Sequence, residues 1–350
     1  MKFEHGQRPY IIAEIGANHN GDVDLAKKMI DTAKNLGCDA VKFQSWDTDL
    51  FAQVVYDENH FLQDDYRNRQ DHTLKSIVEE FRTTPEELTE LATYCRQLGI
   101  DFLSTPFSSA QVDHLVALGA PFLKIASMDL VNDPLLRHAA RTGLPIMLST
   151  GLSSLAEIEH AIETVEAEGN KQIILLHCIS IYPPADEDVH LNVMDTLRQA
   201  FGYPVGFSDH TLGTDIPIAS VVKGAVAIEK HFTLDKDMFG WDHKISADAA
   251  EMGAIVKGAH KVWAALGNPR KVVSEAEMKK RAAFRRSVIS ARAIKAGEVI
   301  GEGDLTFKRP GTGIAPNIAP MLIGMVAARD IPHDKVLTFQ DLQMNGSGVK

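Results

Sequence analysis

Eight short apolar runs, rich in β-branched residues, recur between positions 10 and 231 and are separated by longer amphipathic segments. Runs of this kind predict buried strands, and their alternation with helical segments predicts repeated βα units around a parallel sheet. In chain order the runs are YIIAEIG at 10–16, AVKFQ at 40–44, DFLSTP at 101–106, FLKIAS at 122–127, PIMLST at 145–150, IILLHC at 173–178, PVGFSDH at 204–210 and AVAIEKH at 225–231.

The segments between these runs have the spacing and the ends of helices. Residues 22–37 begin with Asp22, a residue type that caps helix N-termini, and end at Gly37, with apolar residues three and four apart between them. The segments at 85–99 and 153–169 repeat this design. Eight such units predict an α/β fold of the (β/α)8 TIM-barrel type. An open doubly wound sheet is disfavoured because no GxGxxG fingerprint follows the first run.

The texture of the sequence changes after Gly267. Residues 269–286 are rich in charge and lack the alternation, so they predict a linker that contains a short helix. Residues 287–350 carry short β-type runs separated by Gly and Pro, which predict a compact, mostly β module. We therefore expect a barrel at 1–268, a linker, and a small second domain.

A long insertion separates the second and third runs. Residues 45–84 mix acidic and aromatic side chains and break the regular spacing of the units. In a barrel this insertion would follow a strand at the catalytic face, so it is either a substrate lid or a surface excursion.

The composition is that of an ordinary folded protein, with 45% apolar and 24% charged residues. The formal charge of −11 disfavours attraction to phosphate backbones, so we expect no nucleic-acid partner. Three widely spaced cysteines predict no disulfide framework. Neither a signal peptide nor an apolar run of about 18 residues is found, which predicts a cytoplasmic protein without a membrane partner.

Polar residues stand at or near the end of nearly every apolar run. The C-terminal ends of all barrel strands meet at one face, where catalytic groups collect, so these residues predict an active site there. They are Glu14, Lys42, Gln44, Ser104, Thr105, Lys124, Ser127, Ser149, His177, Ser208, His210 and His231.

Two histidines at the ends of adjacent runs, His210 and His231, are candidate ligands for one divalent ion. A two-histidine site would leave positions open for water and substrate, as Lewis-acid catalysis requires. The alternative is that each is a hydrogen-bonded structural histidine. His19, in the Gly- and Asn-rich stretch after the first run, is a third candidate ligand.

Lys42 and Lys124 lie inside apolar runs, where a lysine is rarely buried without an anionic partner. Either each forms an internal salt bridge, or the two together bind a phosphate or carboxylate with help from hydroxyl groups. The hydroxyl groups at the neighbouring run ends are those of Thr105, Ser127, Ser149 and Ser208.

Glu14 is either a general base or an acidic partner for one of the lysines. No serine has a GxSxG context, so hydrolysis by a nucleophilic serine has no support, and Cys178 is predicted to be a packed core thiol.

The ordered motifs IIAEIGANHNGD, DAVKFQ, STPFS, KIAS, LSTG, LLHC with IYP, GFSDHT, EKHFT and KRPGTG cover nearly the whole chain. Together they resemble the sialic acid synthase family, which includes N-acetylneuraminate, legionaminate and pseudaminate synthases and the spore-coat polysaccharide synthase E-like proteins. The resemblance implies a TIM barrel followed by an antifreeze-like SAF domain, and a domain-swapped homodimer in which each small domain covers the partner's site. It also implies that phosphoenolpyruvate condenses with an open-chain N-acylated amino sugar, such as N-acetylmannosamine, to give a nonulosonic acid and phosphate.

The same resemblance implies roles for individual residues. Glu14, His210 and His231 would be catalytic, and the two histidines would hold Mn²⁺, with Mg²⁺ or Co²⁺ as alternatives. The residues expected to bind phosphoenolpyruvate are Lys42, Thr105, Lys124, Ser127, Ser149 and Ser208. The residues expected to contact the sugar are Gln44, Phe107, Asp129, Ser180, Tyr182, Asp242 and, from the small domain of a second copy, Arg309.

Two departures from the family pattern affect the sugar side. Where N-acetylneuraminate synthases carry Gly-Ser-Gly-Glu, this chain reads Ala126-Ser127-Met128-Asp129, and Ser180 stands where those enzymes carry Asn. The acceptor is therefore not fixed as N-acetylmannosamine.

Three other functions compete with this interpretation. An octulosonate- or heptulosonate-phosphate-type synthase would use phosphoenolpyruvate with a sugar phosphate, but the SAF-like tail argues against it. A non-catalytic saccharide- or ice-binding protein is suggested by the tail alone. A metal-dependent hydrolase on the same barrel would carry more His and Asp ligands than this pair.

Overall fold

The computed structural model describes residues 3–4, 6–58 and 73–345. The chain divides into two compact units, Met1–Gly267 and Asn268–Lys350. Among the helices in these described ranges, none combines the length and the apolar character that crossing a membrane would require.

The first unit is built on the eight predicted strands, which form one parallel sheet in the order β3-β2-β1-β8-β7-β6-β5-β4. Because β1 pairs with both β2 and β8, the sheet curves round on itself. In the described chain β3 and β4 lie side by side without a hydrogen-bonded ladder, so the barrel is nearly closed. The TIM-barrel prediction is confirmed. The strands are β1 Tyr10–Gly16, β2 Ala40–Gln44, β3 Asp101–Thr105, β4 Leu123–Ile125, β5 Ile146–Ser149, β6 Ile173–Cys178, β7 Val205–Asp209 and β8 Ala227–His231.

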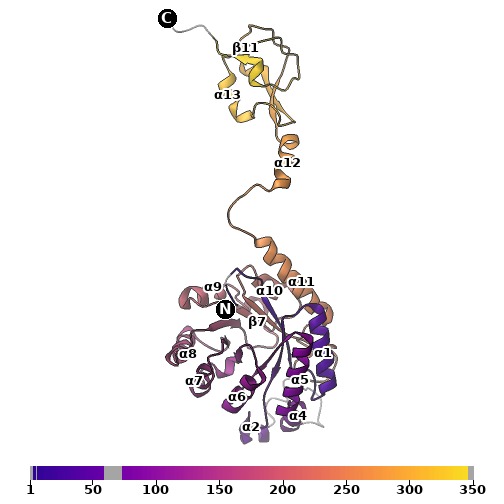
Figure 1. Ribbon diagram of the computed structural model, residues 1–350, viewed down its shortest axis with the longest axis vertical. Helices are drawn as coiled ribbons and strands as arrows, with labels where there is room; N and C mark the ends of the chain where they lie inside the picture. Colours follow the sequence, from indigo (N-terminus) through magenta and orange to yellow (C-terminus); the bar gives the residue numbers. More distant parts are fainter. Residues whose placement is uncertain (1–2, 5, 59–72, 346–350) are drawn as a thin grey trace. The chain divides into compact units, whose positions relative to one another are not determined.

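Helices surround these strands, as Figure 1 shows. They are α1 Val23–Leu36, α5 Pro85–Leu98, α6 Ser109–Leu118, α7 Asp133–Arg141, α8 Leu155–Ala167, α9 Val193–Phe201, α10 Asp215–Ser220 and α11 Ala249–Leu266. The 45–84 insertion contributes α2 Gln53–Glu58 and α4 Leu74–Phe81. Residues 59–72 of that insertion, which the sequence leaves open as a substrate lid or a surface excursion, lie outside the described residues.

The predicted helix ends are confirmed in α1. The Asp22 carboxylate accepts hydrogen bonds from the backbone N–H groups of Asp24 and Leu25, and Gly37 ends the helix in a left-handed conformation with φ 90°. A cap of this kind stabilises a helix by about 1 kcal/mol.

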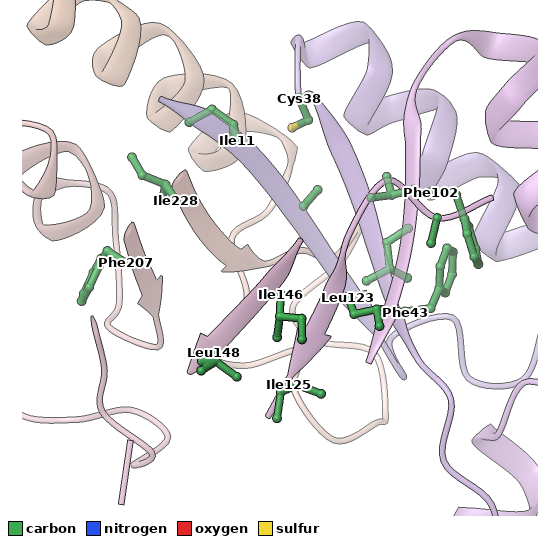
Figure 2. Close-up of a cluster of buried hydrophobic side chains, with 14 of the residues drawn as sticks. Ile11, Cys38, Phe43, Phe102, Leu123, Ile125, Ile146, Leu148, Phe207 and Ile228 are labelled. Atoms are coloured by element: carbon green, nitrogen blue, oxygen red, sulfur yellow. The ribbon is translucent and has the colours of Figure 1, made fainter. Parts of the chain in front are cut away.

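The side chains of the barrel strands point alternately outward and inward. Outward-facing residues such as Ile11, Phe43, Leu148 and Ile228 form the large core beneath the helices, part of which is drawn in Figure 2. Phe3 packs edge-on against Tyr10 and Phe122, with ring centroids 5.2 Å away in each pair. The inward-facing residues that fill the N-terminal half of the barrel are Ile12, Ala40, Leu103, Phe122, Met147, Leu176, Gly206 and Ala227.

The second unit contains both the predicted linker and the predicted small domain, and the mostly β character of that domain is confirmed. It contains the antiparallel pairs β9 Ser287–Ser290 with β10 Leu305–Lys308, and β11 Val326–Ala327 with β12 Leu342–Gln343. Two helices belong to it, α12 Glu275–Phe284 and α13 Ala319–Leu322. Its buried core is separate from the barrel core and includes Val288, Ile294, Leu322 and Leu337.

An internal repeat organises this unit. Positions 294 and 331, 304 and 341, and 305 and 342 hold the same residue types at a constant separation of 37 positions. Ile294 and Ile331 exchange two backbone hydrogen bonds of 2.8 Å across the centre. The pairing of Ser290 with Leu305 is repeated 37 positions later by Ala327 with Leu342. The domain is therefore two similar halves around one core.

Candidate active site

A ring of eight side chains lies one step above the apolar filling of the barrel. Each ring residue stands two positions after an inward-facing filler on the same strand, so strand alternation points it into the barrel near the C-terminal face. The ring is Glu14, Lys42, Thr105, Lys124, Ser149, Cys178, Ser208 and Glu229. Six of these are residues that the sequence analysis singled out for the site, and the barrel brings them together.

Four charged groups in the ring are buried and paired. Nζ of Lys42 lies 2.6 Å from Oε2 of Glu14 and donates to Oγ1 of Thr105 at 2.7 Å. Glu229 lies between the two lysines, 3.9 Å from Lys42 and 3.7 Å from Lys124. The ring thus holds two carboxylates against two ammonium groups, which makes burial of these charges tolerable.

Glu229 is a ring residue that the sequence motifs did not predict. Its Oε1 lies between Nζ of Lys124 and the Ser208 hydroxyl, which donates to it at 2.9 Å. The signal was available, because Glu229 stands two positions before His231 and alternation puts both on the inner face. Cys178, predicted as a core thiol, is buried, but its Sγ lies 3.9 Å from Nδ1 of His210.

The two carboxylates of the ring have opposite pKa shifts. Burial raises the pKa of Glu14 to about 7; the charge of Lys42 opposes this rise and that of Glu229 adds to it. Burial alone would raise the pKa of Glu229, but the charges of Lys124 and Lys42 hold it below its usual value. Glu14 is therefore the carboxylate able to exchange a proton near neutral pH.

Hydroxyl groups and a backbone amide gather on the side of the ring formed by β4, β5 and β6. The Gly151 N–H donates to Oγ of Ser127 at 3.1 Å, and a side chain at Gly151 would collide with the hydroxyls of Ser127 and Ser180. The Ser149 hydroxyl is buried and makes no hydrogen bond within the described structure. These donors suit an anionic ligand, which would satisfy the Ser149 hydroxyl.

The two histidines at the ends of β7 and β8 lie above the ring, with ring centroids 5.5 Å apart. Nδ1 of His210 donates to the Ile179 carbonyl at 2.8 Å, so Nε2 is left with a free lone pair when the ring is neutral. Nδ1 of His231 lies 3.6 Å from Oδ2 of Asp242. The Tyr182 ring packs over His210, with centroids 4.1 Å apart.

The electrostatics of this pair bear on metal binding. Burial and the neighbouring His210 push the pKa of His231 well below its usual value, which keeps His231 neutral. Burial lowers the pKa of His210 as well, but the interactions with Cys178, the Ile179 carbonyl and Asp209 together outweigh burial and raise that pKa. The hydrogen bond to the Ile179 carbonyl fixes the orientation of the His210 ring, and His231 is neutral. Both properties are those of histidines that bind a shared divalent ion. In the described ranges no group of three or more His, Cys, Asp or Glu side chains could hold an ion, so this would be an open two-histidine site.

The barrel residues expected on the sugar side lie at or after the C-terminal ends of their strands. Nε2 of Gln44 donates to Oε1 of Glu14 at 3.1 Å. Asp129 is buried, accepts from Asn132 at 2.9 Å, and has an Oδ2 atom that makes no hydrogen bond in the described chain. Phe107 is half-buried, with its backbone N–H bonded to Gln111. Arg309 belongs to the second unit, where it lies over the Phe284 ring at 4.9 Å.

Three residues from the sequence analysis lie away from the ring. Ser104 and His177 fall at outward positions of their strands, where they bond to Ser45 and to the Val189 carbonyl. Both ring nitrogens of His19 have partners, the Gly21 N–H and the Thr83 hydroxyl, so it is not available as a metal ligand.

A TIM barrel with a polar, partly charged ring at its C-terminal face, followed by a small two-fold β domain, defines a class of two-domain barrel enzyme. Within that class the chain belongs to the NeuB family, whose model matches residues 29–271, and the SAF domain model matches residues 285–343. The resemblance drawn from the sequence motifs is thereby confirmed.

Named relatives are similar over nearly the whole chain. An N,N'-diacetyllegionaminic acid synthase of Legionella pneumophila is 38% identical, covering 95% of this chain and 94% of the relative. A pseudaminic acid synthase of Helicobacter pylori is 32% identical, covering 96% and 98%. The crystal structure of an N-acetylneuraminic acid synthetase from Leptospira borgpetersenii serovar Hardjo-bovis in complex with citrate has a TM-score of 0.68 and 32% identity, covering 79% of this chain and 90% of that chain. These relatives are named for three different nonulosonic acids.

Proposed function

We propose that this protein condenses phosphoenolpyruvate with an open-chain N-acylated amino sugar of the N-acetylmannosamine type, giving a nonulosonic acid and inorganic phosphate. The observation that carries the proposal is the buried ring itself. It places two lysines and several hydroxyls beneath two histidines that face a common space. In such a site a small phosphorylated carboxylate would be bound by the lysines and hydroxyls of the ring. Its other side would face an electrophile, the sugar aldehyde, near the histidines.

The ring supplies the groups that phosphoenolpyruvate needs. Lys42 and Lys124 would neutralise its phosphate and carboxylate, and the unsatisfied Ser149 hydroxyl would gain a partner. The other donors proposed for this substrate are Thr105, Ser127 and Ser208.

The chemistry then needs one new carbon–carbon bond and one lost phosphate. C3 of phosphoenolpyruvate attacks the sugar aldehyde carbon, and the aldehyde oxygen takes up a proton to become a hydroxyl. Water adds to the cationic C2 centre, and Glu14 accepts the proton of that water. When the C2–O bond to phosphate breaks, the new C2 hydroxyl gives its remaining proton to the departing phosphate and becomes the keto group. The proton taken by Glu14 balances the one taken up by the aldehyde oxygen, so atoms and charge balance.

His210 and His231 would hold a divalent metal ion, Mn²⁺ in our proposal, with Mg²⁺ or Co²⁺ as alternatives. When bound, such an ion polarises a carbonyl oxygen as a Lewis acid. The residues themselves fix the site: Ile179 orients His210, and the Tyr182 ring covers it.

The sugar would lie above the ring, near Gln44, Phe107, Tyr182 and Asp242. The buried Asp129 carboxylate and the Ser180 hydroxyl lie on the loops that follow β4 and β6. Both residues differ from the N-acetylneuraminate synthase pattern. The relatives named as legionaminic and pseudaminic acid synthases each align with nearly the whole of this chain. We therefore assign the acceptor to the N-acyl and di-N-acyl hexosamines without fixing it as N-acetylmannosamine.

Exposed apolar side chains at the rim of the barrel are consistent with a second copy of the chain covering this opening. Met128, Leu152, Ile181 and Leu212 are each more than half exposed on the loops after β4, β5, β6 and β7. Apolar side chains grouped around an opening mark an interaction surface. We propose a homodimer in which the partner's small domain covers this rim and brings Arg309 to the sugar.

The test is phosphate release by the purified protein with Mn²⁺. We expect release from phosphoenolpyruvate only when an N-acyl or di-N-acyl hexosamine is added, and a panel of such sugars would identify the acceptor. Release that depends instead on arabinose 5-phosphate or erythrose 4-phosphate would replace this proposal with a sugar-phosphate synthase. Binding of a saccharide without phosphate release would instead indicate a non-catalytic saccharide-binding protein.

A further inference from the structure

The loop that carries Asp242 has no helix or strand of its own. It runs over residues 233–246 and is closed at its base, where Phe232 and Ala247 form an isolated bridge. Asp242 lies within it, with its carboxylate 3.6 Å from His231. A carboxylate on an irregular loop can hold such a position only if other contacts fix the loop.

His243 supplies one of these contacts. Its side chain is 1% exposed. Nε2 lies 3.2 Å from Oδ1 of Asn20, and Nδ1 lies 2.8 Å from the Thr233 hydroxyl. Asn20 also donates from Nδ2 to the Phe239 carbonyl at 2.7 Å, so its Oδ1 must face the histidine.

This arrangement fixes the protonation of the ring. Because Asn20 presents an oxygen, Nε2 of His243 carries the hydrogen and donates it, which leaves Nδ1 as an acceptor. The Thr233 hydroxyl, 2.8 Å from Nδ1, also lies 3.0 Å from the Asp235 carbonyl, and its one hydrogen can serve only one of these two acceptors. Burial lowers the pKa of His243 to about 4, so the imidazole is neutral at pH 7, with its hydrogen on Nε2. At Gly240 a side chain would collide with both the His243 ring and Oδ1 of Asn20.

A second tie holds the backbone of Asp242. Its carbonyl accepts from the Ser246 N–H at 3.0 Å and from the Ser246 hydroxyl at 2.6 Å. That hydroxyl oxygen in turn accepts from Nδ2 of Asn18 at 2.8 Å. Asn18 and Asn20 both belong to the turn after β1, so two asparagines of one turn hold the loop that follows β8.

Aromatic packing reinforces the same loop. Trp241 packs against Trp46, with ring centroids 4.5 Å apart, and Phe239 packs against Phe81 at 6.1 Å. Asp242 thus stands between Trp241 and His243, two side chains that are both anchored to other parts of the barrel unit.

We propose that Asn20 and His243 are positioning residues that hold the Asp242 carboxylate at the mouth of the site, on the sugar side of His231. Neither side chain is assigned a contact with substrate or metal. The inference rests on the proposed function for its kinetic consequence, whereas the anchoring of the loop is a property of the chain alone.

The kinetic arm compares Asn20→Ala, His243→Ala and the double variant with Asn170→Ala. Asn170 is the matched control, because its buried amide also ties two loops, through Ala140 and Leu144, but before β6 at the opposite end of the barrel. Misplacing a substrate group by about 1 Å can cost about a hundredfold in rate. We expect kcat/KM for the acceptor to fall between about tenfold and a hundredfold in either single variant, with KM for phosphoenolpyruvate changed by less than about twofold.

The double variant should be no worse than the more impaired single variant, since both changes remove one link. His243→Gln, which keeps a donor for Asn20, should restore part of the loss. Equal effects on both substrates, additive losses, or an equal loss in Asn170→Ala would overturn the proposal.

A second arm needs no turnover. Hydrogen exchange followed by mass spectrometry should show faster exchange over residues 233–246 in His243→Ala, with residues 10–16 unchanged. Unchanged exchange in the loop would refute the anchoring directly. If the wild-type chain releases no phosphate with any acceptor, the proposed function fails, and this arm still decides whether the network holds the loop.

Discussion

Two glutamates of the ring show how the charge around a side chain decides its chemistry. Glu14 has one close cation, Lys42 at 2.6 Å, and a second carboxylate nearby. Glu229 faces both Lys42 and Lys124 and accepts a hydrogen bond from Ser208. The same residue type therefore has a raised pKa in one place and a lowered pKa in the other.

The raised pKa of Glu14 predicts a pH dependence. A general base must be ionised to act, so activity should be low when Glu14 is protonated and should rise with pH to a plateau, with a midpoint of about 7. Glu14→Gln should lose about 10²–10⁴-fold in kcat and should show no such rise. The measurement is kcat/KM from pH 5.5 to 8.5, because kcat/KM follows the pKa values of the free enzyme.

The comparison with Glu14→Gln shows whether the rise of activity with pH comes from Glu14. If the variant keeps the same midpoint at a lower rate, the group responsible is another one and Glu14 serves only as the partner of Lys42. Circular dichroism of the variant would show whether the barrel remains folded once that pairing is altered.

In the small domain, the two halves of the repeat each end in a buried aspartate. Asp304 accepts from Arg292 and from the Gly301 N–H, and Asp341 accepts from Arg329 and from the Thr338 N–H. Each carboxylate joins a short helical turn to an arginine 12 positions earlier in the chain. These pairs fix the two halves around the shared core.

Asp341 should matter for stability in a pH-dependent way. Burial alone would raise its pKa, but bonds from Lys335, the Thr338 N–H and Arg329 hold it far below the ordinary value. Its contribution is therefore present at neutral pH and is lost as the pH falls below the unfolded-state pKa of about 4. Asp341→Asn should lower the free energy of unfolding of this domain by about 1–3 kcal/mol at pH 7, and by less at pH 3.

Hydrogen exchange over residues 287–343 in the full chain would measure this effect. Asp330→Asn is the matched control, because Asp330 pairs with Lys295 on the surface and an exposed pair contributes about 0–1 kcal/mol. If both variants lowered the free energy of unfolding equally, the burial of Asp341 would make no additional contribution to stability.

The local pattern of apolar and polar residues was enough to predict the strands, the caps of the first helix and most of the ring residues. Eight apolar runs became eight strands, and six ring residues stand where alternation puts them. Ser104 and His177 show the limit, because one step along a strand turns a polar side chain to the outside. The partners of His243 were not predictable, since Asn20 is 223 positions away in the chain and only barrel closure brings the two together.

The proposed dimer makes a prediction about whole chains. Arg309→Ala and His210→Ala should each be inactive, one lacking the small-domain arginine and the other a metal ligand. If each small domain serves the partner's barrel, a mixed dimer has one intact site. After subunit exchange, an equal mixture should regain about a quarter of wild-type phosphate release.

Each variant incubated alone under the same conditions is the control for this mixing experiment. No recovery, together with evidence that subunits have exchanged, would show that the small domain acts on its own barrel. Sedimentation of the wild-type chain would separately establish whether it is a dimer.

The pairing of β1 with β8 has a consequence for the making of the protein. Glu14 and the two asparagines that anchor the last loop come from the first strand and its turn, whereas Glu229, His231 and Asp242 come from the last. A nascent chain that has emerged only through His210 has the lysines and hydroxyls but no carboxylate beside Lys124, no second histidine and no loop carrying Asp242. Catalytic competence would therefore arrive no earlier than the closing of the barrel by its last strand, and a chain terminated before that strand would lack a working site.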